Sequence, residues 1–130
     1  MNVLFINPPN FDELTGFLPE MVDQEAGFNP PLSILFLAGY LLDHSHHHVE
    51  ILDAQVEQLD YTRLEGRLKH IAFDVVGITV MTLTLIDVMR TIDLVKKTNP
   101  ECRVVVGGPH VHLFPEEMLN IAGVDFAVMG

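Results

Sequence analysis

The strongest constraint on the fold comes from one stretch, Val104-Val105-Val106-Gly107-Gly108-Pro109-His110. Three consecutive β-branched residues without a polar break are typical of a strand buried on both faces of a parallel sheet. Glycine has no Cβ, so at Gly107 and Gly108 the backbone can turn sharply or admit another molecule closely. Pro109 then ends the hydrogen-bonded ladder. Open α/β sheets bind ligands where strands end in this way, although a plain strand-to-helix turn uses the same residues.

Composition narrows the class of protein. The 130 residues predict one domain, and 48% of them are apolar, enough for one buried core. The formal net charge of −11 argues against nucleic acid or an anionic membrane as a partner. The longest apolar run, Leu32–Leu42, is too short to span a bilayer. Cys102 is the single cysteine, so this chain can form neither an internal disulfide nor a CxxxCxxC cluster site, and we expect a cytoplasmic protein.

Five short apolar runs predict buried strands, and segments with helical spacing of apolar residues separate them. The predicted strands are Val3–Ile6, Val49–Asp53, Asp74–Val80, Arg103–Val106 and Asp125–Met129, and the predicted helices are Leu32–Asp43, Tyr61–Ile71, a segment carrying Leu85 to Val95, and Pro115–Ile121. The first helix is apolar on nearly every face, so it is predicted to be largely buried. Thr62 and Glu65 match a capping box, and Gly123 is the expected C-terminal cap of the last helix.

This alternation of strands and helices implies right-handed crossovers and a parallel sheet. We therefore expect an α/β fold, a doubly wound five-stranded parallel sheet with the flavodoxin-like strand order 2-1-3-4-5. The chain stops at Gly130 with the far face of the fifth strand uncovered, so residues 1–130 are expected to be one N-terminal domain of a longer protein. Asn10–Asn29 has no firm periodicity and is interpreted as either a functional loop or a linker.

In this topology the loops after strands one, three and four meet at the edge of the sheet where ligands bind. They read Asn7-Pro8-Pro9, Met81-Thr82-Leu83-Thr84 and Gly107-Gly108-Pro109-His110. A phosphoacceptor receiver needs acids and a lysine here, and a nucleotide fold needs GxGxxG or a P-loop after the first strand. A flavin phosphate loop would be rich in serine, threonine and glycine. The three loops instead favour a large, mostly uncharged ligand that is held by hydroxyls, backbone amides and apolar surface.

Several segments together resemble the cobalamin-binding domain at the N-terminus of many radical S-adenosylmethionine enzymes. They are NPP, PPLSILFLAGYL, ILDA, DVVGITVMTLT, and VVVGGPHVHLFPEE followed by VDFAVMG, and they cover nearly the whole chain except Asn10–Gly27. In that family, cobalamin lies over the C-terminal edge of the strands, and its nucleotide tail enters a cleft beside the strand that ends in Gly-Gly.

The resemblance implies a set of cofactor-binding residues. Gly107 and Gly108 would line the tail cleft, and Thr82 and Thr84 could donate hydrogen bonds to the tail or to the corrin amides. The full implied set is Asn7, Pro8, Pro9, Thr79, Met81, Thr82, Thr84, Gly107, Gly108, Pro109, His110 and Gly130. Met81 either packs on the corrin or fills the core.

One departure concerns the cobalt ligand. Methionine-synthase-type domains carry DxHxxG after the first strand, and its histidine ligates cobalt, whereas this chain has Asn7-Pro8-Pro9-Asn10-Phe11-Asp12. We therefore expect base-off cobalamin with no histidine from this loop on cobalt. The resemblance also implies that S-adenosylmethionine and a 4Fe-4S cluster are bound only beyond Gly130, by the protein's own C-terminal radical domain. Methyl transfer or a related radical reaction on a small-molecule substrate would occur there, so this chain alone is expected to be inactive.

Other polar residues have more than one interpretation. Four histidines occupy a predicted helix-to-strand turn away from the ligand edge, and we interpret them as a solvated loop rather than a metal site. They are His44, His46, His47 and His48. His110 is either a cofactor contact, including a distant cobalt ligand, or a surface turn residue. Glu116 and Glu117 lie in the first turn of a predicted helix, where they complement its dipole.

Two other functions stay open at this point. A flavodoxin-like interaction domain without a cofactor predicts a collapsed cleft at Gly107. A small flavin or nucleotide binder predicts a yellow protein.

Overall fold

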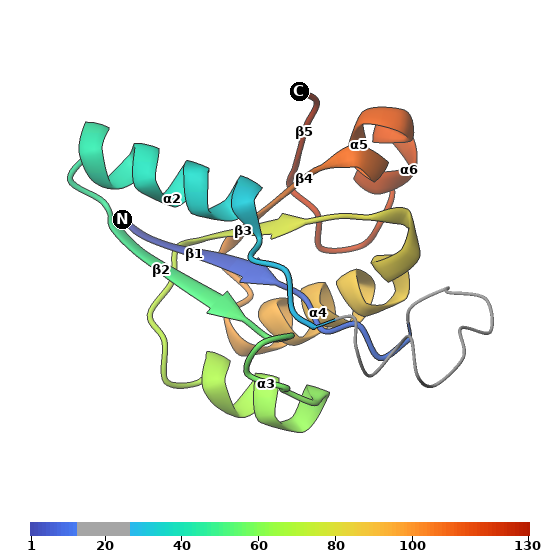
Figure 1. Ribbon diagram of the computed structural model, residues 1–130, viewed down its shortest axis with the longest axis horizontal. Coiled ribbons are helices and arrows are strands. Elements are labelled where there is room, and N and C mark those ends of the chain that lie inside the picture. The colour runs from blue at the N-terminus through green and yellow to red at the C-terminus, as the bar shows by residue number, and fades with distance from the viewer. Residues whose placement is uncertain (13–26) are drawn as a thin grey trace.

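The computed structural model describes residues 1–12 and 27–130 and has the predicted five-stranded parallel sheet, in the order β2-β1-β3-β4-β5 (Figure 1). The strands are β1 (Asn2–Asn7), β2 (His48–Asp53), β3 (Val75–Thr79), β4 (Arg103–Gly107) and β5 (Phe126–Val128). The helices are α2 (Leu32–His44), α3 (Tyr61–Leu68), the 3-10 turn η1 (Thr82–Thr84), α4 (Leu85–Thr98), α5 (Pro109–Leu113) and α6 (Pro115–Leu119). Most of the predicted segment Asn10–Asn29 lies outside the described residues.

One face of the sheet forms the main core. Alternate residues of β1, β3 and β4 point to this face, where they pack against α3, α4, α5 and α6. The buried set includes Leu4, Ile6, Leu52, Val76, Ile78, Val104 and Val106 from the sheet, and Leu64, Leu68, Val88, Ile92, Val95, Val111 and Met118 from the helices. The continuous apolar runs that predicted these strands therefore supply a closed core on this side.

The opposite face is covered only in part. There α2 lies over β1 and β2, and Ile34 and Ala38 pack against Val3 and Phe5. The prediction of a largely buried α2 is wrong, because this helix contacts the sheet through one narrow stripe. Phe36 is 76% exposed. An all-round apolar helix needs neighbours on several sides to be buried, and the described residues supply them on one side only.

The rest of this face, over β3, β4 and β5, remains accessible within the part of the chain that the structure describes. Val75, Gly77, Thr79, Val105 and Gly107 are each half-buried. On β5, Phe126 is 56% and Val128 55% exposed, so the expected uncovered face of the last strand is confirmed for the described residues.

Two predicted helix caps are wrong. The N-cap of α3 is Asp60, which accepts a hydrogen bond from Arg63 N at 2.8 Å, so the capping box at Thr62 lies inside the helix. Gly123 does not cap α6, whose last residue is Leu119 and whose C-cap is Asn120. Gly123 has φ +91°, and an added Cβ there would lie 2.8 Å from Ile92 Cγ2 of α4. No helix described here is long and apolar enough to cross a membrane.

Candidate functional site

The loops after β3 and β4 are joined at the carboxyl edge of the sheet. Val80 N donates to Gly107 O at 2.8 Å, and His110 N donates to Val80 O at 3.2 Å. Gly108 has φ +116°, and a Cβ there would lie 2.9 Å from Val80 O. This turn therefore requires glycine, because an L side chain would be strained by the backbone and would collide with the neighbouring strand. The sharp turn predicted at the Gly-Gly pair is confirmed.

Gly107 has no side chain on the uncovered face of the sheet, and we call the vacant side-chain position there the slot. It aligns with Thr79 of β3 on one side and Val128 of β5 on the other. Among the described residues, the atoms nearest to an added Cβ would be Val128 O at 3.8 Å and Val128 Cβ at 3.9 Å, which are ordinary van der Waals contacts. A Cβ at Gly107 would therefore clash with no described atom, and the collapsed cleft expected of a domain without a cofactor stays a prediction.

The loop after β3 forms an uncharged rim beside this slot. Met81, Thr82 and Leu83 are exposed, so Met81 does not fill the core. Thr84 is buried, and its hydroxyl donates to Met81 O at 3.4 Å. Thr84 therefore uses its donor inside the loop, while the Thr82 side chain lies at the surface.

His110 lies behind this rim. It is 3% exposed, its Nδ1 lies 3.0 Å from Thr82 Oγ1, and its ring centroid lies 5.1 Å from that of Phe114. Its Nε2 is buried without a hydrogen-bond partner among the described residues, and Glu117 Oε1 lies 3.9 Å away. The interpretation of His110 as a surface turn residue is therefore wrong, because α5, which the sequence did not predict, starts at Pro109 and turns the ring inward.

The loop after β1 is held towards β2. Asn7 is buried, and its Nδ2 donates to Asp53 Oδ1 at 2.9 Å. Pro8 O accepts from Gln55 Nε2 at 3.0 Å. Asn7, Pro8 and Pro9 are all buried. The loop therefore lies at the same edge of the sheet as Gly107. The polar partners of Asn7 and Pro8 are Asp53 at the end of β2 and Gln55 just after it.

A polar cluster around the buried Asp87 contacts Asp12 after this first loop, and no sequence motif indicated it. Asp87, in the first turn of α4, is fully buried; its Oδ2 accepts from Asp12 N at 3.0 Å, and its Oδ1 accepts from the Tyr61 hydroxyl. Arg90 pairs with Asp12 and lies 5.0 Å from the Tyr61 ring centroid. Burial, followed by the hydrogen bond to Asp87, raises the pKa of Tyr61 to about 12. Tyr61 is therefore a neutral donor here.

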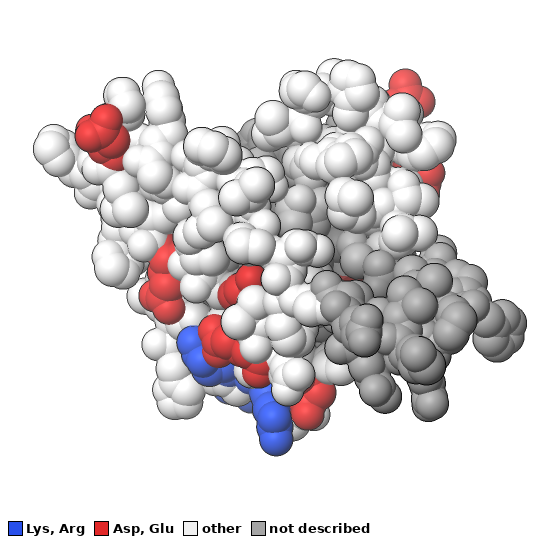
Figure 2. Space-filling model, viewed as in Figure 1, with Lys and Arg blue, Asp and Glu red and all other residues white. Residues whose placement is uncertain are grey.

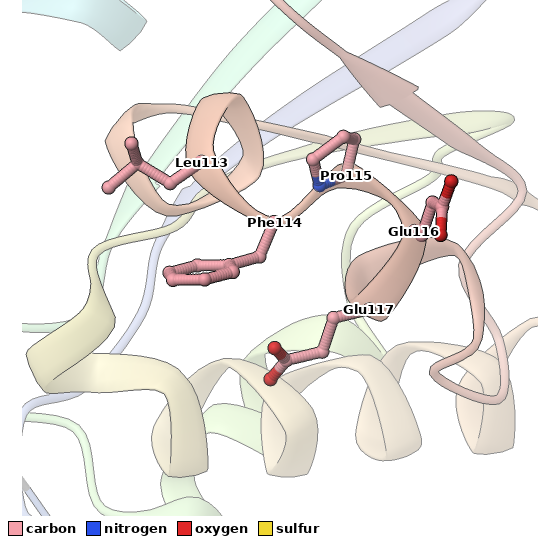
Figure 3. Close-up of a pocket in the computed structure, with 5 residues that line it drawn as sticks. All are labelled: Leu113, Phe114, Pro115, Glu116 and Glu117. Carbon is pink, nitrogen blue, oxygen red and sulfur yellow. The ribbon is translucent and has the colours of Figure 1, made fainter.

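A hollow lies where α5 meets α6, with a volume of about 300 Å³ (Figure 3). Leu113, Phe114, Pro115, Glu116 and Glu117 line it. In Figure 3, Phe114 and Glu117 point into the same space above α4, whereas Glu116 points away. The Glu117 carboxylate lies 3.9 Å from His110 Nε2. No such contact with His110 is found for Glu116 among the described residues.

The histidines of the α2–β2 connection lie at the far end of the sheet from Gly107 (Figure 1). The His44 ring stacks on Tyr40 with centroids 4.2 Å apart. Within residues 1–12 and 27–130, no group of three or more His, Cys, Asp or Glu side chains is placed to hold a metal ion. Gly130, the last predicted site residue, is exposed, and an added Cβ would meet no described atom within 4 Å.

Comparison with known proteins identifies the family. The B12-binding domain family matches residues 21–130. The chain belongs to this family. The resemblance to cobalamin-binding domains is therefore confirmed, and cobalamin is the ligand class of a B12-binding domain.

Relatives of this B12-binding domain are much longer proteins. The chain is 29% identical over 131 residues to the anaerobic magnesium-protoporphyrin IX monomethyl ester cyclase of Rubrivivax gelatinosus, and the match covers 100% of this chain and 22% of that protein. It is 33% identical over 102 residues to an uncharacterized methyltransferase of Pyrococcus horikoshii, covering 78% of this chain and 22% of that protein. The chain thus spans about a fifth of these relatives.

A solved structure shares the fold. The radical S-adenosylmethionine methyltransferase TsrM of Kitasatospora setae, solved with its tryptophan substrate and an S-adenosylmethionine analogue, matches with a TM-score of 0.58 and 22% identity. The match covers 88% of this chain and 20% of that one. At this identity, the likeness supports the arrangement of strands and helices.

Proposed function

We propose that this domain holds cobalamin base-off across the carboxyl edge of the sheet, with the nucleotide tail in the slot at Gly107. The observation that supports the proposal is the vacant side-chain position at Gly107, where an added Cβ would lie in ordinary van der Waals contact with Val128 O, at 3.8 Å, and would clash with no described atom. A strand residue without a side chain, between Thr79 and Val128, leaves room for a flat group to lie against backbone.

The surrounding residues fit a corrinoid. Met81 and Leu83 are 46% and 42% exposed and offer apolar surface beside the slot. Thr79 and Thr82 add hydroxyls, and a large ligand with many amides needs this mixture of apolar area and a few polar contacts. The view in Figure 2 shows mostly uncharged surface between α2 and the α5–α6 region, despite the net charge of −11. When bound, cobalamin supplies a cobalt centre that can carry a methyl group.

We propose that the loop after β1 supplies no histidine to the cobalt and that His110 does not ligate it either. The loop after β1 has Asn7 in the region where related domains carry a ligating histidine, and the Asn7 amide is bound to Asp53. His110 is 3% exposed and its Nδ1 faces Thr82, so it would have to leave its buried position to reach a metal. These contacts support a cobalt without a ligand from Asn7 or His110.

We further propose that the domain serves a radical S-adenosylmethionine reaction, such as methyl transfer to a small molecule. The cyclase and methyltransferase names of the relatives support this reaction class. S-adenosylmethionine and a 4Fe-4S cluster would be held by a radical domain outside this chain, since Cys102 is 1% exposed in the core. The exposed apolar side of α2 and the open face of β5 are the surfaces that such a domain would cover.

Substitution of Gly107 tests the slot. We expect Gly107→Val to weaken hydroxocobalamin binding by about tenfold or more, because the branched side chain fills the slot while suiting a strand. Binding is measured from the visible spectrum after desalting, and folding from thermal melting. Gly39→Ala, on the exposed side of α2, is the matched control and should bind normally. A wild-type chain that retains no corrinoid, or a Gly107→Val variant that binds as well as wild type, would overturn the proposal.

A further inference from the structure

The buried ring of His110 has one satisfied nitrogen and one unsatisfied nitrogen. Nδ1 lies 3.0 Å from the hydroxyl oxygen of Thr82, but Nε2 has no hydrogen-bond partner among the described residues. Buried polar atoms without partners are rare and call for an explanation. The nearest charged group recorded for Nε2 is the carboxylate of Glu117, at 3.9 Å.

This carboxylate decides which nitrogen of a neutral His110 carries the hydrogen. A neutral imidazole has one N–H donor and one acceptor nitrogen. Glu117 attracts an N–H on Nε2, whereas a lone pair on Nε2 would face a negative charge. The favoured tautomer therefore has hydrogen on Nε2. Nδ1 is then an acceptor, so the Thr82 hydroxyl must donate its hydrogen to Nδ1.

Because the Thr82 hydroxyl hydrogen is used in the bond to Nδ1, the Thr82 oxygen can only accept a hydrogen bond from a ligand. It can accept a hydrogen bond from a ligand amide, and it repels a carboxylate, which has no hydrogen to donate. We propose that Glu117 and His110 are positioning residues that make Thr82 a hydrogen-bond acceptor, so that the domain prefers corrinoids with intact propionamide side chains over forms with a hydrolysed, carboxylate side chain. This inference rests on the proposed cobalamin site.

The first test reads the tautomer without any ligand. Nitrogen NMR of the neutral His110 ring is expected to show hydrogen on Nε2. In Glu117→Lys, an ammonium that can only donate faces Nε2, so the hydrogen should move to Nδ1 and free the Thr82 hydroxyl. Glu116→Lys makes the same charge change one residue away on the side that points away from the hollow, and it should leave the tautomer unchanged. Hydrogen on Nδ1 in the wild-type chain would overturn the inference.

The second test measures selectivity. Binding of hydroxocobalamin is compared with binding of its b-, d- and e-monocarboxylate isomers, each with one propionamide hydrolysed. We expect wild type to disfavour at least one isomer by about tenfold, the scale of one lost hydrogen bond beside a repelled charge. Glu117→Lys should remove most of this preference, while Glu116→Lys keeps it. In a Thr82→Val background the preference should be absent, and Glu117→Lys should then have no further effect beyond that of Glu116→Lys.

The outcomes separate the two proposals. If wild type binds none of the corrinoids, the proposed function fails. If hydroxocobalamin binds but all isomers bind equally well, or if the two lysine variants have equal ratios, the cofactor site stands and the role of His110 and Glu117 is wrong. A loss of thermal stability alone would change all affinities together and would leave the ratios unaltered.

Discussion

Asp125 shows how one carboxylate can hold the start of a very short edge strand. Its Oδ2 accepts hydrogen bonds from Lys96 Nζ at 2.7 Å and Val104 N at 2.8 Å, and its Oδ1 accepts one from Arg103 at 3.0 Å. The Lys96 bond, followed by the Val104 bond, lowers the pKa of Asp125 to about 2. The strand β5 has only three residues and so few ladder hydrogen bonds of its own. The hydrogen bonds of Asp125, just before β5, add contacts to β4 and α4.

Removing the Asp125 charge should lower stability in a pH-dependent way. The folded-state pKa of about 2 lies below the ordinary value, so the stabilisation is present above about pH 4 and is lost as pH falls through about 2. We expect Asp125→Asn to lower the free energy of unfolding by about 1–2 kcal/mol at pH 7, allowing for partial solvent screening. The loss should shrink towards zero near pH 2.

Urea unfolding of both chains at several pH values measures this difference. Asp93→Asn, at an exposed position of α4, is the control and should have little effect. A stability loss that stays constant between pH 7 and pH 2.5 would contradict the assigned role of the Asp125 charge.

The helix α2 illustrates how an element can be apolar on most faces and yet lightly buried. Its inward stripe consists of Ile34 and Ala38, while Leu32, Phe36 and Leu37 are more than half exposed. Gly39 lies in its interior, and an added Cβ would meet no described atom within 4 Å. Glycine therefore lowers the stability of this helix through its greater conformational entropy in the unfolded chain, and no close contact among the described residues requires a glycine here.

We expect Gly39→Ala to raise the free energy of unfolding by about 0.5–1 kcal/mol, because alanine restricts the unfolded chain and favours the helix. Thermal or urea unfolding measures the change. Gly123→Ala should move stability in the opposite direction, because Gly123 has φ +91° and an added Cβ would lie 2.8 Å from Ile92. A lower melting temperature for Gly39→Ala would show that an unrecognised contact occupies this position.

The molecule as a whole has a sheet with one closed face and one half-open face. On the closed face, residues from α3, α4, α5 and α6 pack in one core cluster with the sheet. On the other face, two buried apolar residues of β1, Val3 and Phe5, pack against two of α2, Ile34 and Ala38. The open strip carries Val105, Phe126 and Val128, and α2 separately exposes Leu32, Phe36 and Leu37. Exposed apolar surface of this kind can mark an interaction site.

We expect the folded chain to enhance the fluorescence of 1-anilinonaphthalene-8-sulfonate, a dye that binds exposed apolar surface. The double substitution Phe36→Ser and Val128→Ser should reduce this enhancement, while the melting temperature changes little, because these side chains are 76% and 55% exposed. Replacing two buried residues, Val88 and Val104, by alanine is the contrasting control and should lower the melting temperature. Absence of dye binding by the native wild-type chain would refute the expectation.

The sequence by itself determined the strands and their order in the sheet. Runs such as Val104–Val106 have a clear local signal, and the handedness of βαβ crossovers leaves few ways to arrange five of them. The Gly-Gly turn was also predictable, because Gly108, at φ +116°, adopts a backbone conformation that few other residues tolerate.

Only the tertiary structure decided the polar clusters and the exposure of α2. Thr82 and His110 are 28 positions apart, and Asp12 and Arg90 are 78 apart, so no local pattern joins them. Hydrophobic periodicity shows which residues can be buried, but burial also requires a neighbour, and for Phe36 the described residues provide none. Contacts between side chains depend on how separate elements pack, and that information is spread over the whole chain.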